Sequence, residues 1–299
     1  MSKRSTHLIA KRRPDKYALY EEAVQSPDLE IAFIDRVFRR LKGRSPRLLR
    51  EDFAASALIS AAWVRRHHAN FALAIDLDPR PLRYASSHTL AALAPAARTR
   101  VRLHRGNVLS PPDLASPASR GFDVVAALNF SYWCFHDRRT LVDYFRAARE
   151  QLAPDGILVL DFMGGADCHL ETSDRSRRSL KGFGPFTYVW EHAVVEPVSA
   201  RTVCKIHFEF PSLPPRRGPR TRRPRFAPMR NAFVYDWRLW GVRELCDALS
   251  DAGFVRSRVF WEGDDNKGGG NGVFREQTRG TADRSYIGYI VAEKRDRRA

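Results

Sequence analysis

Two acidic residues stand where an α/β protein places groups that contact a ligand. Glu51 lies near the end of the short predicted strand 47–52, and Asp76 lies 25 residues later, at the end of the apolar stretch 71–76. This spacing is typical of a strand–helix–strand unit. On a doubly wound sheet the ligand binds beyond the carboxyl ends of the strands, and an acid after the second strand often accepts hydrogen bonds from ribose hydroxyls. The pair therefore predicts a nucleotide-like ligand.

The segment that joins these two strands has no glycine between positions 48 and 60. Glycine adopts positive φ freely and lets the backbone approach a ligand closely, and alanine in such a conformation costs on the order of 1 kcal/mol or more. If the turn keeps negative φ, alanine costs almost nothing. The sequence leaves both alternatives open, and we expect retained ligand binding with reduced affinity.

The elements that position these acids alternate between apolar strands and amphipathic helices. This alternation predicts an α/β fold with a doubly wound, mostly parallel sheet that is covered on both faces. Ser56, Asp78 and Asp137 are expected to cap helices, and Gly43 is expected to end one. The predicted strands are 47–52, 71–78, 100–108, 122–130, 156–162, 256–263 and 285–294, and the predicted helices include 57–68, 79–93, 140–154 and 241–254.

A different pattern occupies the region between residues 186 and 240. The segments 186–197, 201–210 and 231–240 alternate with period two and are rich in aromatic residues, which predicts an inserted antiparallel β subdomain. The segment 211–228 contains many prolines and arginines and is expected to be a loop. The glycine-rich segment 264–272 is also expected to be a loop, and it lacks the features of a phosphate-binding loop.

The composition restricts the class of protein and its partners. A net charge of +17 would attract polyanions such as nucleic acid, although a solvated basic surface explains it equally simply. No apolar stretch is long enough for a membrane span or for a signal peptide, so we expect a cytoplasmic protein without membrane partners. The four cysteines show no C-x-x-C spacing, which speaks against a disulfide framework and against a structural metal site.

Several short motifs resemble those of class I S-adenosylmethionine-dependent methyltransferases. They include "LREDFAAS", "NFSYW" and "LAPDGILVLDF", and the first is similar to the EDFCGT motif of an uncharacterised bacterial family of such enzymes. In the class pattern acid-x-Gly-x-Gly-x-Gly, Glu51 takes the acidic position, and Phe53, Ala55 and Ala57 take the glycine positions. Ala55 stands where the narrower family keeps its remaining glycine. The resemblance implies a Rossmann-like, seven-stranded sheet.

The resemblance also implies a division of the chain into parts. It implies a basic, disordered tail over 1–14, a helical lid over 15–45 and a cofactor-binding α/β core over 46–163. An antiparallel substrate cap is implied over 164–240, and the remainder of the core over 241–295.

The resemblance implies S-adenosyl-L-methionine as the cofactor. It places Glu51 near the cofactor's amino group and Asp76 on the ribose hydroxyls, and it places Asn107 on the adenine amino group. Asp76 and Asn107 also have purely structural interpretations, as a helix cap and as a turn residue. The remaining residues expected to line the cofactor site are Tyr20, Arg50, Ala54, Ala55, Leu77, Val108 and Asn129.

The segment "NFSYW" is expected to lie beside the methyl group. Asn129, Tyr132 and Trp133 are the candidate catalytic residues, because aromatic rings stabilise a neighbouring sulfonium cation. The alternative is that these aromatic side chains belong to the core. His136 next to Asp137 could act as a base, although the pair fits the start of a helix better.

The candidate acceptor-binding residues are Trp190, Tyr235, Trp237 and Arg238, which belong to or border the inserted sheet. Sheet packing explains these residues equally well. Tyr17 and Tyr20 lie one turn apart in the first predicted helix, where they could cover the cofactor or pack against the rest of the protein.

These observations predict a methyltransferase that acts on a nitrogen or oxygen of a small molecule. Nucleic acid, particularly RNA, is the alternative acceptor, with the basic surface as a phosphate grip. A non-catalytic protein on the same fold is the second alternative, suggested by the missing glycines.

Overall fold

The computed structural model describes residues 13–295, except positions 114 and 116 and the segments 212–225 and 265–269. The chain divides into two compact units. Unit 1 comprises Met1–Gln25 and His169–Trp237, and unit 2 comprises Ser26–Cys168 and Arg238–Ala299. Most of the predicted basic tail 1–14 and of the predicted loop 211–228 lies outside the described residues.

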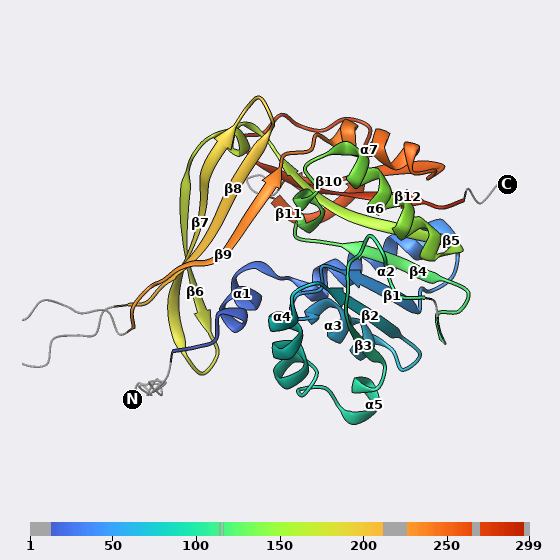
Figure 1. Cartoon of the computed structure of the whole chain (residues 1–299), viewed down its shortest axis with the longest axis horizontal. Coiled ribbons are helices and arrows are strands. Elements are labelled where there is room, and N and C mark those ends of the chain that lie inside the picture. The colour runs from blue at the N-terminus through green and yellow to red at the C-terminus, as the bar shows by residue number, and fades with distance from the viewer. Residues whose placement is uncertain (1–12, 114, 116, 212–225, 265–269, 296–299) are drawn as a thin grey trace, which may run out of the picture. The chain divides into compact units, whose positions relative to one another are not determined.

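Unit 2 contains an eight-stranded sheet with the order β11-β10-β12-β5-β4-β1-β2-β3 (Figure 1). The five strands β5, β4, β1, β2 and β3 run parallel. β12 runs antiparallel to β5, β10 runs antiparallel to β12, and β11 runs antiparallel to β10. This arrangement confirms the predicted mostly parallel sheet. The strands are β1 (Leu48–Asp52), β2 (Phe71–Asp76), β3 (Val101–Arg105), β4 (Phe122–Ala127), β5 (Leu152–Gly164), β10 (Arg256–Asp264), β11 (Gly270–Glu276) and β12 (Tyr286–Glu293).

The sheet has one strand more than the seven that were expected. The end of the glycine-rich segment, predicted as a loop, forms the start of β11 and pairs with β10 at the edge of the sheet. Glycine weakens the period-two signal because it offers no side chain to pack. The start of β11 is therefore a strand because it forms hydrogen bonds with β10, and its own side chains did not predict a strand there.

Helices cover both faces of this sheet. On one face, the apolar side chains of α2 and α3 pack against the alternate strand residues Leu49, Ala126 and Val159. On the other face, Tyr144 of α6 donates a hydrogen bond to Asp52 of β1. The helices of unit 2 are α2 (Pro27–Lys42), α3 (Leu58–Arg66), α4 (Pro79–Tyr84), α5 (Pro95–Arg98), α6 (Arg138–Gln151) and α7 (Val242–Asp251). α4 continues into the π-helical turn η1 (Ala85–Thr89). Two 3₁₀ turns are η2 (Ser131–Cys134) and η3 (Ala166–His169), and the last residue of η3 falls in unit 1.

The predicted capping and stop residues are confirmed with one exception, whereas the predicted helices run two to four residues too far at their carboxyl ends. Gly43 ends α2 at φ 72°, and the carboxylates of Asp78 and Asp137 cap α4 and α6. Ser56 does not cap α3: its hydroxyl has no hydrogen-bond partner among the described residues, and Ala57 precedes the helix at φ 55°. The prediction for Ser56 was wrong because the left-handed turn places α3 one residue later.

Unit 1 consists of a four-stranded antiparallel sheet and one helix. The sheet order is β6-β7-β8-β9, and it confirms the predicted inserted subdomain. β6 was not predicted, because its serines and arginines are exposed along most of its length. The elements are α1 (Lys16–Val24), β6 (Ser173–Leu180), β7 (Gly184–Glu196), β8 (Arg201–Glu209) and β9 (Met229–Arg238), whose last residue falls in unit 2.

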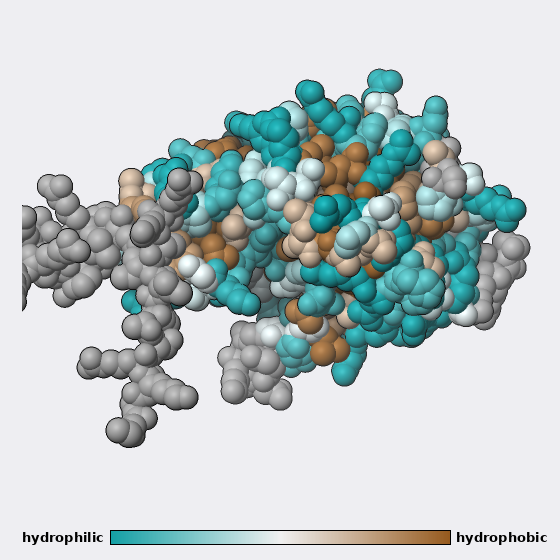
Figure 2. All heavy atoms as spheres, turned by 90° about the horizontal axis from the view of Figure 1, so that it is seen from below, coloured by the Kyte–Doolittle hydropathy of each residue, from teal (hydrophilic) through white to brown (hydrophobic). Residues whose placement is uncertain are grey.

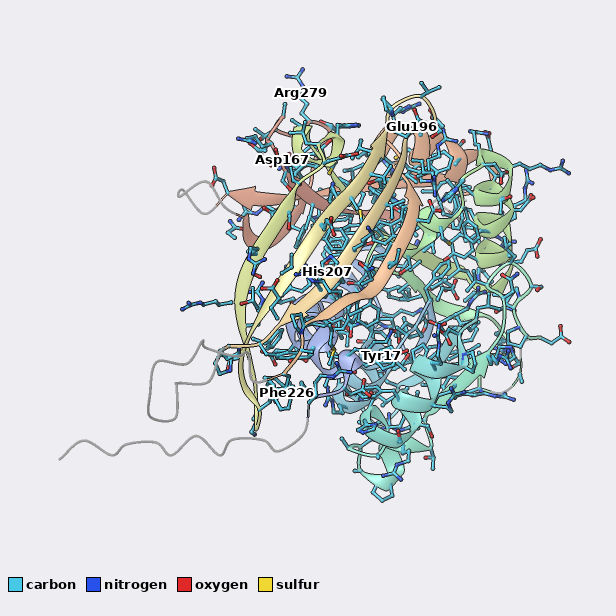
Figure 3. All side chains as sticks on the ribbon, turned by 60° about the vertical axis from the view of Figure 1, so that its left-hand side comes forward. Tyr17, Asp167, Glu196, His207, Phe226 and Arg279 are labelled. Atoms are coloured by element: carbon cyan, nitrogen blue, oxygen red, sulfur yellow. The ribbon has the colours of Figure 1, made fainter. Side chains whose placement is uncertain are left out.

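The helix α1 packs against this sheet. Tyr17 and Tyr20 contact the ring of Phe233 in β9, with ring centroids 5.7 and 4.8 Å apart (Figure 3). Tyr20 is buried in the aromatic core of unit 1. The two helices that the sequence suggested as one lid therefore fall in different units, α1 in unit 1 and α2 in unit 2.

Hydrophilic side chains dominate the face seen in Figure 2, and hydrophobic atoms show between them in small areas. Among the described residues, no helix combines the length and the apolar character that a membrane crossing requires.

Candidate functional site

The turn after β1 adopts the backbone shape of a glycine-rich turn without containing glycine. Phe53, Ala55 and Ala57 have φ values of 54°, 45° and 55°. The alternative in which the turn keeps negative φ is therefore wrong. A left-handed conformation costs an L-residue about 1–2 kcal/mol. The fold maintains this strained turn at the carboxyl end of β1, where a ligand can approach the backbone.

Relief of the strain at Ala55 is the first testable consequence. We expect Ala55→Gly to raise the free energy of unfolding by about 0.5–1 kcal/mol, because glycine adopts the left-handed conformation without strain. The gain is smaller than the strain itself, because glycine also makes the unfolded chain more flexible and so raises the entropy of the unfolded state. Ala55 is only partly buried, so little packing is lost. Urea unfolding measures the change. Ala62→Gly, inside α3, is the matched control and should destabilise by about 1 kcal/mol; equal effects of the two substitutions would contradict the strain.

Asp76, at the end of β2, faces this turn. Its Oδ2 accepts a hydrogen bond from the Ala55 amide and its Oδ1 accepts one from the Asp78 amide, each at 2.8 Å. Burial raises the pKa of the Asp76 carboxyl, and the two amide bonds partly oppose that shift. Because Asp78 caps α4, Asp76 has no capping role. Each of its oxygens keeps a second lone pair, so the carboxylate can accept from two vicinal hydroxyls.

The neighbours of Asp76 also suit a nucleoside. Leu77 is 67% exposed, which leaves an apolar side chain beside the carboxylate for a ring to cover. Asn107 is exposed, and its Oδ1 accepts from the Leu109 amide at 3.0 Å. Val108 is buried, and its carbonyl accepts from the guanidinium of Arg50. Leu77 and Asn107 thus present side chains to a ligand, whereas Val108 can offer only limited contact.

Glu51 and Arg50 point to opposite faces of the sheet, as successive strand residues do. Glu51 is buried and its Oε2 accepts from the backbone amide and the hydroxyl of Ser60 in α3. Burial raises the pKa of Glu51 to about 7. Arg50 is fully buried on the other face, where it is bound to Asp52 and Gln151. A ligand near Glu51 can therefore reach only the backbone of Arg50.

A second strained turn follows β4. Asn129 and Phe130 have φ values of 57° and 55°, and their amides donate to the two carboxylate oxygens of Asp161 at 2.6 and 2.9 Å. Tyr132 is fully buried and donates its hydroxyl to the Asp161 carbonyl at 2.6 Å, and Trp133 is also buried. Asn129 therefore remains the partly exposed member of the predicted catalytic group.

Sequence reasoning missed Asp161. Burial raises its pKa to about 7. A signal was present, because Asp161 directly follows the apolar run 157–160, much as Asp76 follows the apolar run 71–75.

Sequence reasoning also missed Glu30, in the first turn of α2. Only 8% of this residue is exposed, and its Oε2 has no hydrogen-bond partner within the described part of the chain. Burial, followed by the charges of Asp161 and Glu51, raises the pKa of Glu30 to about 8. Its spacing from Ile34 and Val37 places it on the buried face of the helix, and this was the available signal.

The raised pKa values predict a pH-dependent stability. Glutamate in an unfolded chain has a pKa near 4, so between about pH 4 and pH 8 the native state holds more protons at Glu30, and the free energy of unfolding falls as pH rises. Glu30→Gln removes this penalty. We expect the variant to match the wild type at pH 4 and to exceed it by at least about 1.4 kcal/mol at pH 9, measured by urea unfolding. A difference that stays constant with pH would contradict this assignment.

The candidate acceptor residues form an aromatic group in unit 1. The rings of Tyr235 and Trp237 stack at 4.6 Å, and the ring of Trp190 lies 6.1 Å from each. The guanidinium of Arg238 instead lies 3.8 Å from the Trp240 ring and donates to the carbonyl of His136.

The opposite side of the same sheet holds a polar pair. Nε2 of His207 lies 2.7 Å from Glu191, and Nδ1 of His207 accepts from the Asn231 amide at 2.8 Å (Figure 3). Because Nδ1 is an acceptor, the proton resides on Nε2 and points to the carboxylate.

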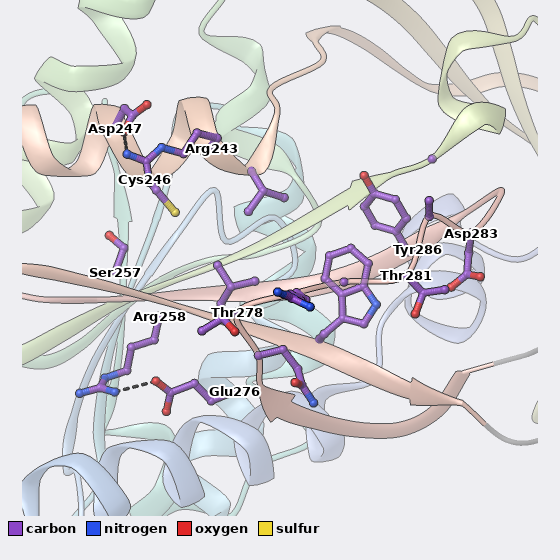
Figure 4. A pocket seen from close by; sticks show the side chains of 18 of the residues that line it. Arg243, Cys246, Asp247, Ser257, Arg258, Glu276, Thr278, Thr281, Asp283 and Tyr286 are labelled. Atoms are coloured by element: carbon purple, nitrogen blue, oxygen red, sulfur yellow. Dashed lines mark hydrogen bonds and ion pairs between the residues drawn. The ribbon is translucent and has the colours of Figure 1, made fainter.

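A groove of about 1150 Å³ lies elsewhere in unit 2, between α7, β10 and the segment 277–286 (Figure 4). The ion pair between Arg258 and Glu276 lies at this groove. None of the predicted site residues lines it. The groove is therefore separate from the turn after β1.

Comparisons with known proteins agree with this architecture. No family model and no curated protein matches the sequence. Solved structures do match. DesVI from Streptomyces venezuelae has a TM-score of 0.64 at 16% identity over 94% of this chain and 99% of its own. CalS10, an amino pentose methyltransferase from Micromonospora echinaspora solved with S-adenosylmethionine bound, has a TM-score of 0.61 at 15% identity over 96% and 99%.

KedS8, a sugar N-methyltransferase from a Streptoalloteichus species, has a TM-score of 0.60 at 17% identity over 99% of both chains. The chain thus has the Rossmann-like fold of class I S-adenosylmethionine-dependent methyltransferases, with an inserted β subdomain. At these identities the likeness concerns the fold, and the activity requires an argument from the site.

Proposed function

We propose that this protein is an S-adenosyl-L-methionine-dependent methyltransferase that acts on an amine or hydroxyl of a small molecule. The observation that carries the proposal is the strained turn at Phe53, Ala55 and Ala57 beside the carboxylate of Asp76. Three non-glycine residues with positive φ lower the stability of the fold, and such backbone strain concentrates at functional sites. The fold on which this turn lies supports the same activity.

The residues fit the cofactor group by group. Asp76 accepts from the two ribose hydroxyls, Leu77 covers one face of the adenine, and Asn107 accepts from the adenine amino group with its remaining lone pair. The backbone of Ala54 and Ala55 borders the amino acid portion. When bound, the cofactor supplies an already activated methyl group, so the protein mainly aligns the acceptor and excludes water.

In this proposal Asn129 lies beside the reacting centre. Asp161 holds the turn of Asn129 and Phe130 through two amide bonds, and Tyr132 ties the same turn to β5. Tyr132 and Trp133 are fully or almost fully buried, so they position this turn and form its apolar backing. Of the predicted catalytic residues, only Asn129 is proposed to contact substrate.

The acceptor is proposed to be an amine or hydroxyl of a small, planar or sugar-like molecule. The partly exposed rings of Tyr235 and Trp190 offer an aromatic surface to such a molecule, and the buried ring of Trp237 stacks behind Tyr235. CalS10 and KedS8 are described as methyltransferases of an amino pentose and of a sugar nitrogen, which supports amino sugars as the first acceptors to test.

Isothermal titration of the purified chain with S-adenosylmethionine and S-adenosylhomocysteine tests the cofactor. We expect both to bind in the micromolar range, with one site per chain. A panel of amino sugars and of RNA, assayed for S-adenosylhomocysteine release, then tests the acceptor class. Absence of binding to folded protein would overturn the enzyme proposal, and release with RNA alone would overturn the small-molecule acceptor.

A further inference from the structure

A small cavity of unit 2 lies at the amino ends of β1 and β2. Arg47 directly precedes β1, and Asn70 directly precedes β2. Both residues line the cavity together with side chains of α2 and of the end of α3, and its volume is about 130 Å³. One water molecule takes up about 30 Å³ in the liquid, so the cavity has room for one small polyatomic ion. The turn after β1 lies at the other end of the same strand, so this cavity is separate from the cofactor site.

Three arginines and one histidine line this cavity, with a single carboxylate among them. These residues are Arg39, Arg47, Arg66, His67 and Asp35. Oδ2 of Asp35 lies 3.4 Å from Nε of Arg39 and 3.6 Å from a terminal nitrogen of Arg66, so one carboxylate is shared by two guanidinium groups. Even with His67 neutral, three cations face one anion, which leaves an excess of two positive charges.

The lining keeps N–H groups that a ligand can use. Arg47 donates to the side-chain oxygen of Asn70 at 3.1 Å and forms no ion pair within the described part of the chain. In Arg39 only Nε has a partner among the described residues, which leaves both terminal nitrogens. Nδ1 of His67 accepts from the Ala69 amide at 3.0 Å, so the proton of the neutral ring resides on Nε2. The cavity therefore offers guanidinium and imidazole donors to an anion.

Helix capping does not explain this group of cations. The carboxyl end of a helix carries partial negative charge, and α3 ends beside the cavity with His67 as its cap. Arg100 already serves that end, because its guanidinium donates to the carbonyls of His67 and Asn70 at 2.9 and 2.7 Å. Partial burial, followed by the charges of Arg47, His68 and Arg100, lowers the pKa of His67. The cations thus repel one another, and a bound anion would relieve the repulsion.

We propose that this cavity binds a phosphate group, as inorganic phosphate or as the terminal phosphate of a monoester. A tetrahedral dianion accepts from guanidinium groups on several sides, and such charge-assisted hydrogen bonds are among the strongest in proteins. Its two negative charges match the excess of two positive charges in the lining. This second site goes beyond the proposed function and does not depend on it.

Isothermal titration with inorganic phosphate, in a buffer of low ionic strength without sulfate, tests the site. We expect one site per chain with a dissociation constant in the millimolar range or below. Arg47→Gln should weaken binding at least about 10-fold, because it removes charge-assisted hydrogen bonds. Arg65→Gln is the matched control: this exposed arginine precedes Arg66 in α3 without lining the cavity, and its loss should change the affinity less than about twofold.

The ring protons of His67 report on the cavity itself. In an NMR titration, saturating phosphate should raise the pKa of His67 in the wild type, because an anion stabilises the imidazolium. The same phosphate concentration should shift this pKa much less in Arg47→Gln. Arg66→Gln serves as a second variant if Arg47→Gln does not fold, and it should show the same loss.

Glycerol 3-phosphate, glycerol and a short single-stranded RNA identify the source of the phosphate. Glycerol 3-phosphate should bind and glycerol should not, and the tighter of inorganic phosphate and glycerol 3-phosphate marks the preferred form. Binding of RNA alone would overturn the proposal. Absence of phosphate binding to folded wild type, or equal losses in Arg47→Gln and Arg65→Gln, would also overturn it. Because S-adenosylhomocysteine is titrated separately, these results would leave the proposed function standing.

Discussion

Replacement of Asp76 by alanine is expected to weaken S-adenosylhomocysteine binding at least about 100-fold. Two hydrogen bonds from ribose hydroxyls to a carboxylate are worth about 1.5–3 kcal/mol each, and a factor of 100 corresponds to about 2.7 kcal/mol. The geometry supports this magnitude, because the Ala55 and Asp78 amides hold both carboxylate oxygens in place at 2.8 Å. Isothermal titration measures the affinity.

Asp78→Ala is the matched control for this prediction. Asp78 lies two residues further on, and its carboxylate accepts from the Arg80 amide as the cap of α4. Its loss should reduce the free energy of unfolding by about 1 kcal/mol and leave the affinity unchanged. If both variants lost affinity equally, the effect would come from the stability of this loop, and the assignment of Asp76 to the ribose would fail. Asp76→Ala should also weaken 5′-methylthioadenosine, because that ligand keeps both ribose hydroxyls.

Replacement of Asp52 by asparagine is expected to destabilise the protein by about 3–5 kcal/mol. Asp52 and Arg50 form an ion pair with both side chains at 0% exposure and two bonds of 2.7 and 2.9 Å. The Asp52 carboxylate also accepts from the hydroxyl of Tyr144. Removal of one partner of a buried pair leaves the other charge uncompensated in the interior. Urea unfolding at pH 7 measures the loss.

Two further variants separate the charge effect from lost packing. The double variant Arg50→Met, Asp52→Leu removes both charges and should recover most of the stability, since a buried ion pair contributes little over apolar side chains of similar volume. Asp247→Asn breaks an exposed pair with Arg243 and should cost at most about 0.5 kcal/mol. A double variant as unstable as Asp52→Asn would show that the pair is required for its geometry.

The strands and helices of unit 2 were largely predictable because burial decides them. A strand covered on both faces reads as a continuous apolar stretch, as in 122–127, where every residue is buried. Edge strands are harder to predict, because half of their hydrogen bonds and much of their side-chain surface face water. β6 and β11 were missed for this reason.

The candidate site was predictable to a similar extent. Asp76 was found because it ends an apolar strand and Glu51 because it lies 25 residues before Asp76, and Asp161 carries a similar signal as the acid after an apolar run. Glu30 differs, because a single acid on the inner side of a helix acquires meaning only when the neighbouring strands supply Glu51 and Asp161. Arg50 shows the converse: the family resemblance suggested that it lines the cofactor site, yet alternation along the strand turns its side chain toward Asp52.

By itself the sequence determined most of the strands and helices, because the period of the apolar residues records which side of each element is buried. It also determined which acids end the central strands. Only the tertiary structure decided the backbone of the turn at Phe53, Ala55 and Ala57, because no local preference of these residues favours positive φ. The packing of β1, β2 and α3 around the turn imposes that conformation. The packing of α2 against the sheet likewise buries Glu30 where the charges of Asp161 and Glu51 act on it, and no local pattern records a distance between such residues.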